Sequence, residues 1–209
     1  MTLVAARENM VDSQIRTDDV GDPALQAALR HVARERFCAP GQAALAYADR
    51  QPEIAPGRAL LQPRDAGKLL QALRPRAGER ALTICEPYLA AVLAEAGCEV
   101  VAFDTAAVNA RVGEAVGEAG AEVVTGDPAA LAVDGAFDVI AVGGAVVEVP
   151  PAWFALLEDG GRLGAVVRSG PVGRATLFVR SGDATTGRAA FDAAPIHLPG
   201  LEPKAAFAF

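Results

Sequence analysis

The fold of this chain is decided by residues 81–97, ALTICEPYLAAVLAEAG. A short apolar run, a turn with proline and a longer apolar run predict a buried strand, a tight turn and a helix. The next apolar run, EVVAFD at residues 99–104, predicts a strand that ends in an acid, and a Gly-Asp pair follows at residues 126–127. This order of elements is the layout of a nucleotide-binding α/β half.

The turn itself, Cys85-Glu86-Pro87, contains no glycine. A turn that cradles a nucleotide usually carries glycine, because the backbone must approach the ligand closely and often needs φ > 0. Pro87 removes an N–H that an anion could use, and Glu86 should stabilise the helix dipole as a cap while repelling an anionic ligand. Two interpretations stay open: ordinary strand–helix packing, and residual nucleotide binding.

Beyond this segment the chain alternates strands with helices and then continues strand after strand. This pattern predicts an α/β fold with a mostly parallel seven-stranded sheet, antiparallel C-terminal strands and an N-terminal helical extension. The expected helices are two within 6–33, then 63–73, 87–96, 106–119 and 151–158. The expected strands are 80–85, 99–104, 122–125, 137–143, 160–168, 174–180 and 187–193. Residues 36–62 are expected to be irregular, and Phe207 and Phe209 are expected to close an edge of the sheet. The strand residues expected to be buried are Leu82, Ile84, Val100, Val101, Val123, Val139, Ile140 and Val142.

Composition narrows the class of protein. The chain has 209 residues, of which 52% are hydrophobic, and a net charge of −7. One domain over 1–209 is expected, with an extension at 1–75 and a Rossmann-like core at 76–209. The acidic balance argues against a nucleic-acid or anionic-membrane surface, and no apolar run reaches the ~20 residues that span a bilayer. The three cysteines have no metal-ligand spacing and favour a reducing cytoplasm, and the first residues do not predict a signal peptide.

A set of motifs in a fixed order covers nearly the whole chain. They are ENMVDSQIR at 8–16, VARERF at 32–37, AYAD at 46–49, IAPGRALLQP at 54–63, FDVIAVGGAVVEVP at 137–150 and GGRL at 160–163. Together with the strand–turn–helix segment they resemble the protein-L-isoaspartate O-methyltransferase family, which depends on S-adenosylmethionine. Each motif alone is weak, and their order and spacing carry the resemblance.

The resemblance implies the S-adenosylmethionine-dependent methyltransferase fold and a repair reaction, methyl transfer from S-adenosylmethionine to isoaspartyl carboxylates in damaged proteins. It implies a protein or peptide as substrate or partner, and it leaves a homodimer open. The candidate cofactor-binding residues are Glu86, Tyr88, Asp104, Asp127 and Gly143. In the family's pattern an acid at the place of Asp104 holds the ribose hydroxyls, and Asp127 resembles the acid that reads the adenine amine. Two structural alternatives stay open, a helix-capping role for Asp104 and a turn role for Asp127.

The chain also departs from the family's pattern. The turn after the first strand is two residues shorter, and Cys85 stands where a glycine usually opens it. Leu61 stands where the substrate segment carries a hydroxyl, and leucine can neither donate nor accept a hydrogen bond. We therefore assign no catalytic residue and predict that methyl transfer is weakened or lost. The alternatives are a non-catalytic binding or scaffold module, and a nucleotide sensor that uses Asp104 and Asp127.

Two other features could carry chemistry. His31 and His197 lie far apart in the sequence without a Ser or Cys placed as a partner, so we expect satisfied or exposed side chains rather than a general base. The pair Gly143-Gly144 ends an expected strand, where it serves either as a tight strand exit or as a place for the close approach of a substrate backbone.

Overall fold

The computed structural model describes residues 2–203, and Phe207 and Phe209 lie outside this part of the chain. A seven-stranded sheet forms the centre, in the order β5-β4-β3-β6-β7-β8-β9. The first five of these strands are parallel, and β8 and β9 are antiparallel additions, which confirms the predicted sheet. The strands are β3 (Arg80–Ile84), β4 (Glu99–Asp104), β5 (Glu122–Thr125), β6 (Phe137–Val146), β7 (Leu157–Val167), β8 (Gly173–Ser181) and β9 (Ala184–Ala193).

The apolar runs of the central strands are buried on both faces, as a covered parallel sheet requires. Of the eight strand residues expected to be buried, seven are. Val123 is half-buried instead, because β5 pairs only with β4 and forms the edge of the sheet.

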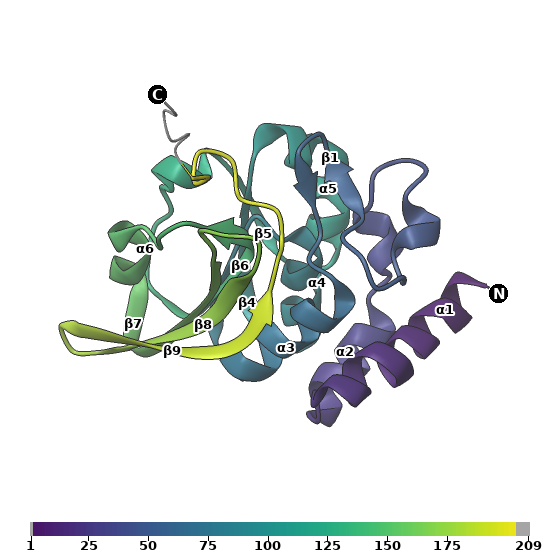
Figure 1. Ribbon diagram of the computed structural model, residues 1–209, viewed down its shortest axis with the longest axis horizontal. Helices are drawn as coiled ribbons and strands as arrows, with labels where there is room; N and C mark the ends of the chain where they lie inside the picture. Colours follow the sequence, from purple (N-terminus) through teal and green to yellow (C-terminus); the bar gives the residue numbers. More distant parts are fainter. Residues whose placement is uncertain (1, 204–209) are drawn as a thin grey trace.

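Helices cover the two faces of the sheet unequally. One face packs against α3 (Pro63–Leu73), α4 (Pro87–Glu95) and α5 (Ala106–Glu118) in the larger apolar cluster. The other face is covered by the short α6 (Pro151–Ala155) and by a C-terminal segment that contributes Leu198. Figure 1 shows the N-terminal helices on the outer side of α4, at the opposite end of the molecule from the curled antiparallel strands.

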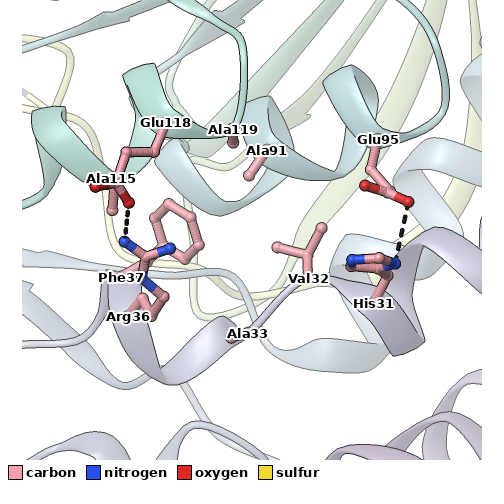
Figure 2. A pocket seen from close by; sticks show the side chains of 10 residues that line it. All are labelled: His31, Val32, Ala33, Arg36, Phe37, Ala91, Glu95, Ala115, Glu118 and Ala119. Atoms are coloured by element: carbon pink, nitrogen blue, oxygen red, sulfur yellow. Dashed lines mark hydrogen bonds and ion pairs between the residues drawn. The ribbon is translucent and has the colours of Figure 1, made fainter.

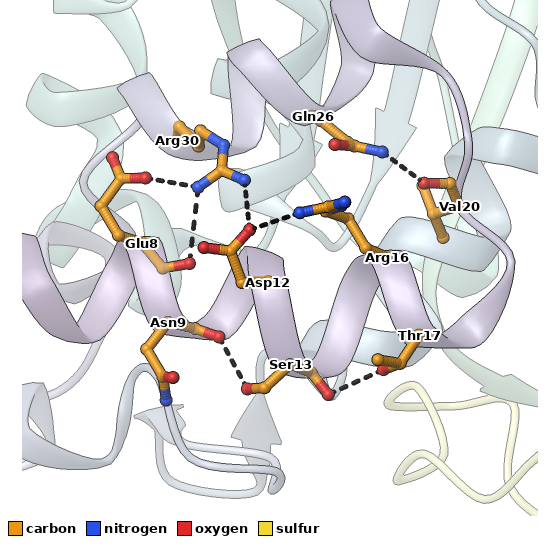
Figure 3. A network of polar contacts seen from close by, with 9 residues as sticks. All are labelled: Glu8, Asn9, Asp12, Ser13, Arg16, Thr17, Val20, Gln26 and Arg30. Atoms are coloured by element: carbon orange, nitrogen blue, oxygen red, sulfur yellow. Dashed lines mark hydrogen bonds and ion pairs between the residues drawn. The ribbon is translucent and has the colours of Figure 1, made fainter.

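The N-terminal extension begins with α1 (Leu3–Met10), continues through a π turn (Val11–Ile15) and a 3₁₀ turn (Arg16–Asp18), and ends with α2 (Pro23–His31). Arg30 on α2 joins these pieces, because its guanidinium reaches the carboxylates of Glu8 and Asp12, as Figure 3 shows. Asp22 caps α2 by accepting from the backbone N–H groups of Ala24 and Leu25, as the sequence Asp-Pro indicates.

Residues 36–62 are more ordered than their sequence predicts. They contain two 3₁₀ turns (Arg34–Phe37, which begins just before the range, and Ala43–Leu45) and a small hairpin, β1 (Glu53–Ala55) with β2 (Arg58–Ala59). The prediction missed the hairpin because strands of two and three residues give no alternating pattern to detect. We call residues 51–62 the strap, because this segment reaches the carboxyl ends of β3 and β4 through Arg58.

The helix predicted over 151–158 is wrong at its end. It stops at Ala155, and β7 begins at Leu157. The backbone N–H of Phe137 donates to the carbonyl of Leu156 at 2.8 Å, so strand pairing with β6 starts there.

Candidate functional site

Strand order reverses between β3 and β6, which lie side by side at the centre of the sheet. In open α/β sheets, ligands bind in the crevice outside the carboxyl ends of the strands at such a switch point. Here Cys85 follows the end of β3, and Gly143 lies on β6 directly after the residue paired with Ile84. These two residues therefore form the walls of the crevice.

The turn after β3 closes this crevice. Cys85 is fully buried and adopts φ +62°, the left-handed conformation expected for this turn but taken without glycine. An L-residue there costs roughly 1–2 kcal/mol. A Cβ placed on Gly143 would lie under 3.0 Å from both the Cys85 carbonyl oxygen and the Cβ of Glu86. Gly143 is thus approached by this chain's own turn.

Gly144 is enclosed in the same way on the other face. A Cβ placed there would lie under 3.0 Å from the side chain of Leu198. The segment that carries Leu198 is held by β6, since the Ala145 N–H donates to the carbonyl of Ile196 at 2.8 Å and the Leu198 N–H donates back to the Ala145 carbonyl at 2.9 Å. Both glycines therefore serve close packing within the chain.

Glu86 is buried and does not cap α4, which corrects the expected capping role. Its side chain makes no cap hydrogen bond to the helix, and one carboxylate oxygen accepts instead from the Leu61 N–H of the strap at 3.1 Å. Burial raises the pKa of Glu86 to about 7, against the opposing effects of Arg34 and of the Leu61 N–H. The carboxyl group is therefore poised to change charge near neutral pH.

Arg34 packs beside this acid. Its Nε donates to the Ala46 carbonyl at 2.8 Å, and its Nη2 donates to the Leu61 carbonyl. The guanidinium carbon lies 4.6 Å from the centre of the Tyr88 ring, a cation–π contact. Burial raises the pKa of Tyr88 to about 12. Leu61 is thus held by Arg34 through its carbonyl and by Glu86 through its N–H.

Arg58 occupies the end of β4. One of its nitrogens, Nη2, donates to the Cys85 carbonyl at 2.6 Å and lies 3.2 and 3.4 Å from the two carboxylate oxygens of Asp104. Both partners of this ion pair are almost completely buried. Burial raises the pKa of Asp104, while the Arg58 guanidinium and the N–H of Thr105, which donates at 2.8 Å, oppose the rise. Asp104 is therefore engaged by the chain itself.

Several polar atoms in this cluster are buried and have no hydrogen-bond partner within residues 2–203. They come from four side chains: Arg34 Nη1, Arg58 Nε and Nη1, Glu86 Oε1 and Tyr88 Oη. Each unpartnered buried polar group costs about 1–3 kcal/mol. Their concentration at one edge of the sheet makes this place the candidate functional site.

The neighbouring half of the same edge is open. A hollow of about 440 Å³ lies beyond the ends of β4 and β5, beside Thr105, which follows Asp104. Asp127 is exposed there, and its carboxylate caps its own turn by accepting from the Ala129 N–H at 2.9 Å. The residues that line the hollow are Thr105, Ala106, Thr125, Gly126, Asp127, Pro128, Pro199 and Gly200.

The two histidines lie away from this edge. His31 is exposed, 3.3 Å from the carboxylate of Glu95, and His197 contacts Arg168 through both ring nitrogens at 3.0 Å. Figure 2 shows His31 in a separate pocket of about 330 Å³ between the N-terminal extension and helices α4 and α5, where Arg36 also pairs with Glu118. Neither histidine contacts a nucleophile, as expected. Within residues 2–203, no cluster of metal-ligating side chains is found, and no helix is long and apolar enough to cross a membrane.

The sheet and its switch point define the class, which is the S-adenosylmethionine-dependent methyltransferase fold. The chain belongs to the protein-L-isoaspartate (D-aspartate) O-methyltransferase family, whose family model matches residues 5–191. It is 37% identical over 181 residues to the protein-L-isoaspartate O-methyltransferase of Methylorubrum populi, covering 83% of this chain and 84% of that protein. It is 35% identical over 181 residues to the enzyme of Opitutus terrae, covering 83% and 76%.

Solved structures agree on the fold. A protein-L-isoaspartate O-methyltransferase superposes with a TM-score of 0.77 at 20% identity, covering 96% of this chain and 67% of that chain. A putative protein-L-isoaspartate O-methyltransferase from Plasmodium falciparum, solved with S-adenosyl-L-homocysteine, superposes with a TM-score of 0.74 at 16% identity, covering 92% and 97%. The family resemblance thus gives S-adenosylmethionine as the cofactor.

The residues of the carboxyl edge do not fit S-adenosylmethionine in the arrangement described. Asp104, whose place in the family pattern holds the ribose, is engaged by Arg58. The crevice next to it is closed by contact of Gly143 with the Cys85 backbone and the Cβ of Glu86. The side of the edge at Asp127 is open. The candidate residues Glu86, Tyr88, Asp104 and Gly143 are brought together, while Asp127 lies at the open half.

Sequence reasoning missed Arg34 and Arg58 as members of this site. Both lie inside motifs that carry the family resemblance, at 32–37 and 54–63. The sequence did contain a signal for Arg58, which lies two residues before the apolar pair Leu60-Leu61. If that pair is buried, as it is, the neighbouring cation is buried too and needs an anionic partner.

Proposed function

We propose that this chain is a protein-L-isoaspartate O-methyltransferase homologue in which methyl transfer to isoaspartyl carboxylates is weakened or absent. The observation that carries the proposal is the contact of Arg58 with both the Cys85 carbonyl and the Asp104 carboxylate. In the family pattern the acid at the place of Asp104 holds the ribose, so an Asp104 carboxylate engaged by Arg58 supports the proposal. The closed turn at Gly143 supports it independently.

The function kept under this proposal is binding of a protein or peptide, since the family acts on protein substrates. Residues 54–63, most of which lie in the strap, resemble the family's substrate-site segment, and Leu61 stands at the place of its hydroxyl residue. The compartment that we propose is the cytoplasm, because Cys38, Cys85 and Cys98 are all free thiols.

The deciding experiment incubates the purified chain with S-adenosylmethionine tritiated on its methyl group and an isoaspartyl peptide. We expect methyl ester formation to stay at the uncatalysed background, and the matched aspartyl peptide is the substrate control. The Methylorubrum populi relative, assayed in parallel, provides the active reference. Turnover by the unmodified chain at a rate close to that reference would overturn the proposal.

Leu61→Ser tests whether the substrate side alone accounts for the loss. We expect no activity from this variant, because transfer requires the donor to be held at near-attack distance from the carboxylate. The Leu61 side chain takes part neither in the Arg58–Asp104 pair nor in the contact of the turn with Gly143, so this substitution does not remove either. Activity gained by Leu61→Ser would show that the turn admits the cofactor after all.

A further inference from the structure

We propose that Arg58 is the residue that decides whether the carboxyl edge accepts a nucleoside, by holding the carboxylate that vicinal ribose hydroxyls would otherwise contact. The inference rests on the proposed function, since it explains why the cofactor half-site is closed. It also predicts that the closure is reversible by one substitution. The ligand class is a nucleoside with both sugar hydroxyls and a flat base.

The first support is the set of elements that Arg58 joins. The side chain leaves β2 of the strap and reaches both the turn after β3 and the end of β4. All of its hydrogen bonds to these partners come from the single nitrogen Nη2. One side chain therefore links the strap to both the turn after β3 and the end of β4.

The second support is how poorly Arg58 is satisfied in that place. Its Nε and Nη1 are buried without a partner in residues 2–203. A guanidinium suited to its site binds a carboxylate through two parallel hydrogen bonds, whereas this one uses one nitrogen for both oxygens and a carbonyl. Buried ion pairs of this kind add little stability over well-packed alternatives. The environment of Arg58 is therefore better suited to exclusion than to stabilisation.

The third support is the open volume beside Asp104. The hollow of about 440 Å³ is lined by Thr105, which follows Asp104 directly, and by Thr125, which pairs with it across the sheet. The Gly126 N–H also donates to the Asp104 carbonyl at 3.1 Å. Asp104 is thus next in sequence to Thr105 and paired across the sheet with Thr125, both of which line the hollow, while its carboxylate contacts Arg58. We expect truncation of Arg58 to free that carboxylate for the sugar of a nucleoside whose base lies in the hollow.

The closed turn limits what the opened edge would bind. Gly143 lies against backbone atoms of Cys85 and the Cβ of Glu86, which a substitution at position 58 does not remove. The amino-acid arm of S-adenosylhomocysteine would therefore find no place, and only the nucleoside half would gain contacts. A gain in nucleoside binding without a further gain for S-adenosylhomocysteine therefore differs from the result expected if the whole cofactor site were restored.

The experiment compares the unmodified chain, Arg58→Ala and Arg58→Gln by calorimetric titration with adenosine, 2′,3′-dideoxyadenosine and S-adenosylhomocysteine. Arg50→Ala, an exposed arginine just before the strap, is the matched control. We expect Arg58→Ala and Arg58→Gln to bind adenosine at least tenfold more tightly than the unmodified chain and Arg50→Ala do. Dideoxyadenosine should lose that gain, and S-adenosylhomocysteine should bind no more than about threefold better than adenosine.

Every other outcome overturns the inference. Failure of both folded Arg58 variants to bind adenosine would show that the turn, not Arg58, excludes the nucleoside. Unfolding of both variants would show that the Arg58–Asp104 ion pair is required for folding, so that its role is structural. If the unmodified chain binds adenosine as tightly as the Arg58 variants do, Arg58 does not exclude the nucleoside. If the Arg58 variants bind S-adenosylhomocysteine much more tightly than adenosine, the turn at Gly143 is not closed. The proposed function is judged separately, by turnover of the unmodified chain.

Discussion

The two halves of the carboxyl edge differ sharply, although they lie on neighbouring strands. The turn side, at β3 and β6, is closed by the Cys85-Glu86 turn and holds the buried Glu86, and Arg58 links this side to Asp104 at the end of β4. The base side, at β4 and β5, keeps a hollow of about 440 Å³ and an exposed acid, Asp127. The strap and the turn after β3 therefore close one part of the edge, while the part beside Asp127 stays open. Parallel strands of one sheet position both parts.

Removing the acid of the buried pair should have the largest effect. Asp104→Ala leaves the Arg58 guanidinium buried without its counter-ion and the Thr105 N–H without its acceptor. Breaking such a pair costs about 3–5 kcal/mol of unfolding free energy. Urea unfolding measures this loss.

The matched control for that prediction is the double variant Asp104→Ala with Arg58→Ala. Because both charges are then removed, we expect the loss to be well below the sum of the two single losses. Additive losses of unfolding free energy would mean that the Arg58 and Asp104 side chains do not stabilise each other. The charged groups of the turn side would then be no more strongly coupled than those of the base side.

The next largest effect concerns pH. The folded-state pKa of Glu86 is raised to about 7 from 4.5, so the folded chain binds more protons than the unfolded chain between these values. Stability should therefore fall as pH rises from about 4.5 to about 7, by up to about 3 kcal/mol, and Glu86→Gln should remove this fall. Urea unfolding at several pH values checks it, with the exposed Glu158→Gln as the charge-matched control. An identical pH profile in Glu86→Gln and the unmodified chain would contradict the prediction.

A methyl group added to the closed crevice should cost somewhat less. Gly143→Ala places a Cβ against the Cys85 carbonyl and Glu86, and backbone cannot move away as a flexible side chain can. We expect a loss of about 1–3 kcal/mol. In contrast, Gly117→Ala on α5 meets no atom within 4 Å, so it should gain about 0.5–1 kcal/mol. If thermal and urea unfolding show Gly143→Ala as stable as Gly117→Ala, the crevice is open.

The strands of the sheet could be predicted because each of them is encoded by an apolar run of a few consecutive residues. Runs such as 81–84 and 100–103 are mostly apolar and buried on both faces, whereas Val123 of the edge strand β5 is half-buried. The acid at the end of β4 was also placed correctly. The partners of that acid could not be predicted, because Arg58 lies 46 residues from Asp104 and its strap has strands too short to give a period. Cys85 likewise adopts a conformation that sequence rules assign to glycine.

The smallest effect should come from the base side, at Asp127. Its carboxylate is exposed and, within residues 2–203, accepts from the nearby Ala129 N–H alone, so Asp127→Ala should cost about 1 kcal/mol, the usual value of a lost cap. Asp127→Asn keeps the cap and should stay within about 0.5 kcal/mol of the unmodified chain in urea unfolding. A loss from Asp127→Asn as large as that from Asp104→Ala would mean that Asp127 also belongs to a buried charge network. The base side would then be as constrained as the turn side. A small loss leaves the hollow free to accept a base without disturbing the fold, which is the state that the Arg58 variants require.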